Sequence, residues 1–190
     1  LLRLYNIDKG KITIGDTPID MIDIGFLRER IGIVNQSPFL FNSTIRDNIG
    51  YGLSNPTMEQ IKIAAQQSQA MEFIETLPRG FDTIVGERGQ MLSGGQQQRI
   101  AIARTVIRNP DIVIFDEATS SVDNKTEQLI QKALFNIQKG RTSIIIAHRL
   151  STIRNCNSIF LIKNGKIAEQ GNHESLLGNK NSYYSLLWNI

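Results

Sequence analysis

The chain has 190 residues, of which 41% are hydrophobic and 21% are charged, so it is long enough to bury one sizeable core and too short for two. Its formal net charge of +3 comes from Lys and Arg residues scattered along the sequence, a distribution that gives no support to nucleic-acid binding. The single cysteine, Cys156, cannot form a disulfide within the chain, which argues against a small secreted scaffold, and no apolar run approaches the about 20 residues of a membrane-spanning helix.

The first third of the chain predicts short strands followed by helices. Lys11 to Gly15 and Ile31 to Asn35 are typical of short strands. Thr57 and Gln60 stand three residues apart ahead of an apolar stripe, which predicts a capping box at the start of a helix. A second short helix is expected from Met71 to Leu77.

The middle of the chain predicts a strand, helix, strand unit. A helix begins after the glycines Gly94 and Gly95 and cannot continue through Pro110. The runs Ile112 to Phe115 and Ser143 to Ala147 are almost purely apolar, which is typical of strands in a parallel sheet covered on both faces. Between them, a stripe at helical spacing predicts a crossover helix, formed by Leu129, Ile130, Ala133, Leu134 and Ile137. The predicted fold class is therefore α/β.

The last part of the chain predicts a hairpin and a helix. Ser158 to Gly171 contains two strand-like pieces around Asn164 and Gly165, a dipeptide that favours a type I′ turn. A terminal helix is expected from about Glu174 to Trp188, with an interruption at Gly178 and Asn179 left open.

Asp116 and Glu117 follow directly after an apolar strand. This places them at the C-terminal end of that strand, the edge at which open α/β sheets bind ligands. A carboxylate there can hold Mg²⁺, and the neighbouring Glu can polarise an attacking water. The alternative is a pair of solvated acids that open a loop.

The segment Ser93 to Gln96 has two interpretations. Ser93 and Gln96 fit a capping box at the start of an ordinary helix. The glycines Gly94 and Gly95 also allow the backbone to approach a phosphate, which the helix N-terminus would attract. Capping does not require two consecutive glycines, and this favours phosphate binding.

Five motifs in a fixed order resemble the nucleotide-binding domain of ATP-binding-cassette (ABC) transporters of the exporter type. They are Gln36 at the end of a strand, LSGGQ at Leu92 to Gln96, IVIFDE at Ile112 to Glu117, Asp123, and His148 at the end of the next apolar strand. Each is weak alone, but the order and spacing of all five argue against chance, and the resemblance covers essentially the whole chain.

The resemblance implies a role for each of these residues. Gln36 matches the Q-loop glutamine, which reaches Mg²⁺ and the attacking water. Asp116 matches the Walker B aspartate that binds Mg²⁺, Glu117 the catalytic glutamate, and His148 the switch histidine that contacts the γ-phosphate. Asp123 matches the D-loop aspartate at the dimer interface, although it follows Ser, Ser, Val where the family usually has Ser, Ala, Leu. Asp123 also fits an N-cap.

The signature motif in this family covers ATP that the other domain of a pair holds. The residues implied in nucleotide binding are thus Ser93, Gly94, Gly95, Gln96 and Asp123. Gly86 to Gly89, with the sequence GERG, resembles the X-loop of exporters, which touches transmembrane helices; a solvated turn is the alternative. Phe39 to Phe41 resembles the apolar patch that receives a coupling helix, or belongs to the core.

The implied fold is a core like that of P-loop NTPases, with a parallel sheet flanked by helices. Residues 1–41 and 108–190 are assigned to this core, and residues 42–107 to an inserted helical subdomain. No Walker A run, G-x-x-x-x-G-K-S/T, occurs in the chain. We expect that loop just upstream, together with further strands, and Leu1 to Tyr5 as the end of the helix that follows it. The chain alone is therefore expected not to hydrolyse ATP.

The expected cofactors are ATP and Mg²⁺. The expected partners are a second ABC ATPase domain, identical or different, and a transmembrane domain N-terminal in the same polypeptide, at the cytoplasmic face of the cell membrane. Two alternatives stay open: a soluble ABC ATPase that acts on ribosomes or DNA, and a regulatory domain that binds nucleotide without cleaving it. The lack of heptads between Gln36 and Leu92 argues against the coiled-coil DNA relatives, and the unaltered LSGGQ with Glu117 and His148 argues against the regulatory domain.

Overall fold

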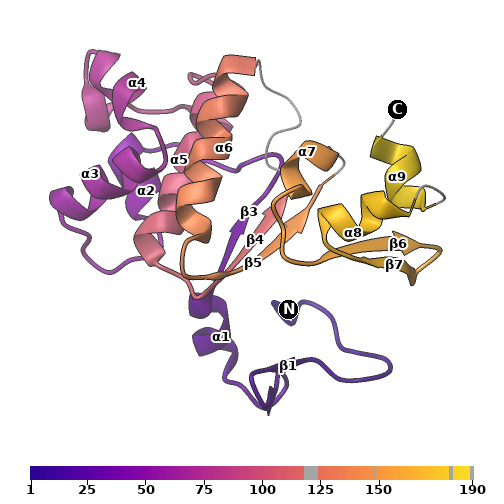
Figure 1. The fold of residues 1–190 in the computed structure, drawn as a ribbon. Coiled ribbons are helices and arrows are strands. Elements are labelled where there is room, and N and C mark those ends of the chain that lie inside the picture. Colours follow the sequence, from indigo (N-terminus) through magenta and orange to yellow (C-terminus); the bar gives the residue numbers. More distant parts are fainter. Residues whose placement is uncertain (118–123, 148, 180–181, 189–190) are drawn as a thin grey trace. The chain divides into compact units, whose positions relative to one another are not determined.

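The computed structural model is a mixed α/β structure that divides into two units, residues 1–144 and 145–190, which are described separately (Figure 1). The structure describes residues 1–117, 124–147, 149–179 and 182–188. Within these residues, no helix is both long enough and apolar enough to cross a membrane.

A three-stranded sheet has the order β3-β4-β5. Its strands are β3 (Ile31–Val34), β4 (Ile112–Asp116) and β5 (Thr142–Ile146). β3 and β4 run parallel, with Ile31 opposite Ile112 and Val34 opposite Phe115. The predicted α/β class with a parallel sheet is therefore confirmed.

The two apolar strands differ in how well they are covered. In β4, Val113 and Phe115 are buried, and Ile114 packs from the other face against a cluster around Leu27. In β5, by contrast, Ile144 and Ile146 are 38% and 50% exposed. The expectation that both strands are covered on both faces is correct for β4 and wrong for β5, because β5 stands at the end of the strand order in the described residues.

The chain begins with irregular backbone and a short hairpin. Leu1 to Tyr5 are not helical, contrary to expectation, since five residues form too few hydrogen bonds to offset the cost of helix nucleation. The strand expected at Lys11 to Gly15 is only two residues long, β1 (Thr13–Ile14), and pairs antiparallel with β2 (Thr17–Pro18). Helix α1 (Ile24–Arg30) then leads directly into β3.

A group of helices follows β3. They are α2 (Ile45–Gly50), α3 (Met58–Gln67), α4 (Met71–Thr76), the 3₁₀ turns η1 (Gly80–Asp82) and η2 (Glu87–Gly89), and α5 (Gly94–Arg108). The capping box between Thr57 and Gln60 is confirmed, with both hydrogen bonds present. Helix α2 also has a capping box, between Thr44 and Asp47, that was not predicted. Hydrogen bonds from the Ser43 and Thr44 side chains hold the pKa of the Asp47 carboxyl below its ordinary value.

Helix α5 is the longest element of this group and packs against α2, α3 and α6 (Figure 1). It ends at Asn109, which adopts the left-handed conformation of a C-cap one residue before Pro110. Helix α6 (Asn124–Gln138) confirms the predicted crossover helix. Its apolar stripe is buried at Ile130, Ala133, Leu134 and Ile137.

In the second unit, residues 145–190, the described part forms a hairpin and short helices. They are α7 (Leu150–Ile153), β6 (Ile159–Lys163), β7 (Lys166–Gly171), α8 (His173–Gly178) and α9 (Tyr183–Trp188). The predicted hairpin turn is confirmed, since Asn164 and Gly165 have φ angles of 51° and 72°, and a type I′ turn requires positive values at both positions. The expected terminal helix is divided into α8 and α9, and α8 ends at Gly178, where the sequence left an interruption open.

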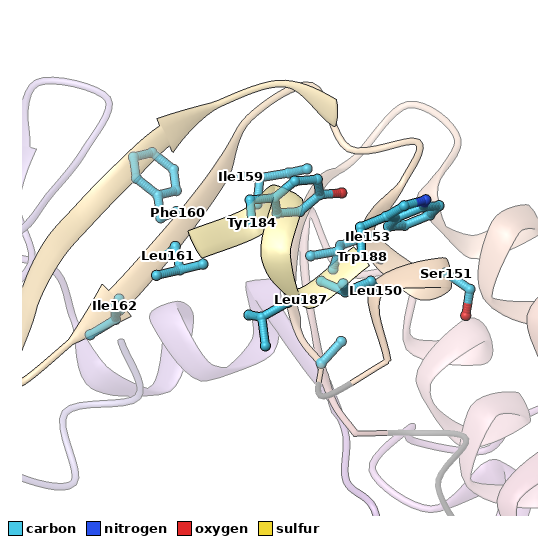
Figure 2. Close-up of a pocket in the computed structure, with 11 residues that line it drawn as sticks. Leu150, Ser151, Ile153, Ile159, Phe160, Leu161, Ile162, Tyr184, Leu187 and Trp188 are labelled. Carbon is cyan, nitrogen blue, oxygen red and sulfur yellow. The ribbon is translucent and has the colours of Figure 1, made fainter. Parts of the chain in front are cut away.

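A small core holds this unit together. Ile159, Leu176 and Tyr184 are buried, and the Tyr184 hydroxyl lies 2.8 Å from Nδ1 of His173. Burial raises the pKa of the Tyr184 hydroxyl. Side chains of α7, β6 and α9 line a largely apolar pocket of about 660 Å³ beside this core (Figure 2).

Candidate functional site

Three of the predicted catalytic and metal-binding residues lie at or just beyond the ends of β3 and β4, at one edge of the sheet. Val34 pairs with Phe115, and the two strands run in the same direction. Gln36 lies two residues beyond Val34, and Glu117 lies two residues beyond Phe115, with Asp116 between. Gln36 and Asp116 are exposed to solvent, and Glu117 is half-buried. The parallel register therefore supports the shared site that the sequence predicts.

Glu117 also has an unusual backbone conformation. Its φ angle is 47°, in the left-handed region that costs a residue other than glycine about 1–2 kcal/mol. Strained conformations of this kind concentrate at functional sites, because the surrounding structure has to hold them in place. The left-handed residue comes immediately after the last residue of β4.

The start of α5 combines both interpretations of the segment Ser93 to Gln96. The capping box is confirmed: the Ser93 amide donates to Oε1 of Gln96 at 2.9 Å, and the Gln96 amide donates to Oγ of Ser93 at 3.3 Å. Among the described residues, no hydrogen bond is made by the amides of Gly94 and Gly95. These two amides at the positive end of a 15-residue helix are suited to an anion, so phosphate binding here stays a prediction supported by the geometry.

The two glycines have different surroundings. Gly94 is exposed, and a Cβ added to it would have no atom within 4 Å. Gly95 is buried, and a Cβ added there would lie 2.0 Å from Cγ2 of Thr126 on α6. Only Gly94 thus has room for a side chain, whereas the missing side chain at Gly95 allows α5 and α6 to pack closely.

Replacing Gly95 with Ala is therefore expected to destabilise the fold by about 1–3 kcal/mol, because the new methyl group overlaps Thr126. Urea unfolding measures the change. The substitution Thr126→Ser removes the overlapping methyl and should recover most of the loss in the double variant. Gly94→Ala is the matched control, with an expected change within about 0.5 kcal/mol. Equal losses from the two Ala variants would contradict this explanation.

The GERG segment forms a tight turn tied to α5. Gly86, Arg88 and Gly89 have φ angles of 75°, 52° and 78°, and the side chains of Glu87 and Arg88 are exposed. The Gln97 side chain holds this segment, since its Nε2 donates to the carbonyl oxygens of Gly89 and Leu92, both at 3.0 Å. An exposed turn is compatible with both interpretations of GERG, and its role as an X-loop stays a prediction.

Two side chains of α5 hold the loop after β3, and sequence reasoning missed both. Gln98 is buried and donates from Nε2 to the carbonyl oxygen of Asn35 at 3.0 Å. Arg104 donates from Nη1 to the carbonyl oxygen of Phe39 at 2.8 Å. The sequence offers one indication of their role: Gln98 and Arg104 are polar residues on a helix whose inner face is otherwise mostly apolar. Their partners lie more than sixty residues away in sequence, at separations of 63 and 65.

Arg104 also joins this loop to α2. Its Nε donates to the carbonyl oxygen of Asn48 and its Nη2 to Oδ1 of Asn48, both at 2.8 Å. Its guanidinium lies 5.4 Å from the centre of the Phe41 ring and 5.6 Å from that of Tyr51. Burial lowers the pKa of the Arg104 guanidinium from its ordinary value.

The three residues of the predicted apolar patch differ in exposure. Leu40 is fully buried and belongs to the core, Phe41 is half-buried, and Phe39 is 55% exposed. Phe39 and Phe41 meet edge to face, with ring centres 5.2 Å apart. The expectation of core is therefore confirmed for Leu40, whereas the role of this segment as a patch for a coupling helix stays a prediction.

The site fits a Mg²⁺ ion that takes most of its ligands from phosphate and water and only one or two from the protein. The described residues contain no group of three or more His, Cys, Asp or Glu side chains that could form a protein cage for a metal. Asp116 and Gln36 offer oxygen ligands at the same sheet edge, and Mg²⁺ is usually held by one or two such ligands together with water and phosphate oxygens. The predicted residues Asp123 and His148 lie outside the described residues.

Comparison with known proteins gives one consistent family. Residues 1–120 match the family model described as ABC transporter. The chain is 51% identical over 187 residues to ABC transporter B family member 4 of Dictyostelium discoideum, a match that covers 98% of this chain and 24% of that protein. It is 50% identical over 186 residues to the ATP-dependent lipid A-core flippase of Saccharophagus degradans, covering 98% of this chain and 32% of that protein.

Among solved structures, the chain is similar to a bacterial Atm1-family ABC exporter with ATP bound. The TM-score is 0.93 at 43% sequence identity, and the match covers 100% of this chain and 33% of the exporter chain. The chain thus spans about a quarter to a third of the length of these three proteins.

Proposed function

Because the chain belongs to the ABC transporter family, we propose that it forms most of the ATP-hydrolysing domain of an exporter. One observation supports this proposal: β3 and β4 pair in parallel, with Val34 opposite Phe115, so the residues that follow them, Gln36, Asp116 and Glu117, come at the same sheet edge. The family implies ATP binding, and this edge offers the oxygen ligands and the carboxylate base that hydrolysis of bound ATP requires.

Each of these side chains has a distinct task in the proposed reaction. Asp116 and Gln36 hold the Mg²⁺ that accompanies ATP, which when bound neutralises charge on the phosphates. Glu117 accepts a proton from the attacking water, and the strained backbone that follows β4 fixes the direction of its carboxylate. Asp123 and His148 are assigned to the dimer contact and the γ-phosphate contact on the strength of the sequence resemblance.

The start of α5 supplies the other half of a composite site. We assign the amides of Gly94 and Gly95, with Ser93 and Gln96 as the cap that holds their turn, to the phosphates of ATP bound by a second ABC domain. Two domains facing each other would thus enclose two ATP molecules, each between the β3–β4 edge of one domain and the α5 turn of the other. The domain would work as a pair, either of identical or of different chains.

The relatives support a membrane partner. Two of them are named as an exporter and a flippase, and the chain matches only part of each. We propose a transmembrane domain in the same polypeptide, with the exposed Phe39 and the GERG turn facing it, at the cytoplasmic face of the membrane. The transported substrate would contact that domain and is not assigned.

The test uses the purified complete protein in lipid vesicles. We expect ATP hydrolysis in the presence of Mg²⁺, its loss with a chelator and its recovery when Mg²⁺ is added back. Nucleotide binding without hydrolysis would favour a regulatory domain. Hydrolysis that requires ribosomes or DNA, and not lipid, would favour a soluble relative of the family. Either result would overturn the exporter proposal.

A further inference from the structure

The segment that carries Gln36 is attached to α5 at both ends. Asn35, immediately before Gln36, accepts a hydrogen bond from Gln98 at 3.0 Å. Phe39, three residues after Gln36, accepts one from Arg104 at 2.8 Å. Both acceptors are backbone carbonyl oxygens beyond the end of β3, where sheet hydrogen bonds no longer fix the chain.

The two attachments enclose a short segment, from Asn35 to Phe39. Gln98 and Arg104 are six residues apart on one helix, which corresponds to about 9 Å along the helix axis. The chain from Asn35 to Phe39 spans at most about 14 Å when fully extended. Gln36 therefore lies on a short bridge between two fixed points of a rigid helix.

The hydrogen bond from Gln98 is also well protected. The Gln98 side chain is only 2% exposed, so water competes little for the carbonyl oxygen of Asn35. About two turns further along α5, the Thr105 hydroxyl lies 3.4 Å from the carbonyl oxygen of Ile33 within β3 and 3.2 Å from that of Ala101, so its one proton is shared between the strand and its own helix. Helix α5 is thus fastened to the regular strand by Thr105 and to the segment beyond it by Gln98.

Gln98 is close to the start of α5 as well. It follows Gly94 by four residues, about one helical turn, and the helix between them is continuous. A displacement of the Gly94 turn would therefore carry Gln98, and with it the backbone next to Gln36.

We propose that Gln98 is a positioning residue that couples the α5 turn to Gln36, with Arg104 as the second anchor of the same segment. This inference rests on the proposed function, because it assigns Gln98 an effect on ATP turnover through Gln36. Gln98 touches neither nucleotide nor metal in this scheme. Its side chain sets the backbone position from which Gln36 reaches them.

The first test is Gln98→Met in the complete protein, since Met is similar in size and cannot donate the hydrogen bond. We expect kcat to fall about tenfold, since a displacement of well under 1 Å at a catalytic group has effects of this order. KM for ATP should change by less than about twofold, because the groups that bind ATP are retained. Rates are expressed per bound ATP, so that partial unfolding does not imitate the effect.

Thr105→Val is the matched control. It removes the hydroxyl that Ile33 and Ala101 share, and with it a contact between the same helix and the same strand, but at Ile33, where the sheet already fixes the backbone. We expect a loss of stability from this variant without a change in kcat. A tenfold fall in kcat with Thr105→Val would show that any loosening of α5 lowers turnover, and would overturn the proposal.

The decisive comparison is made in a Gln36→Ala background. If Gln98 acts through Gln36, Gln98→Met should lower kcat there by no more than about twofold. The milder variant Arg104→Lys, which keeps one donor and the charge, should show the same dependence on Gln36 at the other anchor. An unchanged kcat for Gln98→Met with Gln36 present, or an equal fall in both backgrounds, would overturn the proposal.

These outcomes are separate from failure of the proposed function. If the wild-type protein hydrolyses ATP and the rate depends on Glu117, the proposed function stands whatever Gln98→Met does. If the wild-type protein does not hydrolyse ATP, the proposed function fails, and the coupling through Gln36 fails with it.

Discussion

Replacing Glu117 with Gln in the complete protein is expected to lower the turnover of ATP by about 10²-fold or more while ATP still binds. Gln has the same shape as Glu and fits the left-handed backbone at this position equally well, so the fold and the sheet edge are retained. An amide cannot accept the proton of the attacking water. The loss should therefore appear in kcat, with little change in the affinity for ATP.

The measurement pairs a steady-state ATPase assay with equilibrium binding of labelled ATP. Glu59→Gln serves as the control, because Glu59 is an exposed residue in the first turn of α3 and has no assigned role in the proposed site. Turnover near the wild-type value in Glu117→Gln would remove Glu117 from the catalytic role. Loss of ATP binding in the same variant would point to a structural role instead.

The substitution Gly94→Asp is expected to lower turnover by about 10²-fold or more without destabilising the fold. Nothing lies within 4 Å of a Cβ at Gly94, and an acidic residue in the first turn of a helix is favourable. The new carboxylate would, however, stand where phosphate oxygens are expected, and facing like charges cost several kcal/mol. Urea unfolding and the ATPase assay together separate the two effects. Gly94→Asn, similar in size and neutral, should retain more activity than Gly94→Asp.

Mixed pairs show which ATP molecule the α5 turn acts on. If Glu117→Gln is placed in one domain and Gly94→Asp in the other, both defects fall in the same composite site, and the second site stays intact. If both substitutions are placed in one domain, each site carries one defect. We expect residual turnover in the first arrangement and almost none in the second. The reverse pattern would mean that the α5 turn acts on ATP of its own domain.

Local features of this fold can be predicted well from the sequence. The capping box at Thr57, the Asn164–Gly165 turn and the end of α5 before Pro110 depend on residues within one or two turns, and the structure contains all three. The position of Asp116 at the end of β4 follows in the same way, because a run of apolar residues that ends in an acid marks the strand and its end together. The capping box between Thr44 and Asp47 is of the same local type and could also have been predicted from the sequence.

Contacts between distant segments could not be predicted in this way. Gln98 was expected only as part of a helix, since nothing near it in the sequence identifies Asn35 as its partner. The different roles of Gly94 and Gly95 depend on Thr126, which the crossing of α5 and α6 brings close. The exposure of β5 depends on its place in the strand order. In each case tertiary packing, and not local propensity, decides the environment of the residue.

The left-handed backbone of Glu117 sets stability and activity against each other at one position. Glycine adopts a φ of 47° without steric cost, so replacing Glu117 with Gly would relieve strain while removing the carboxylate. A library selected only for thermal stability would therefore tend to enrich inactive chains at this site. Engineering a more robust version of the domain thus requires that position 117 be kept fixed and that stability be sought elsewhere.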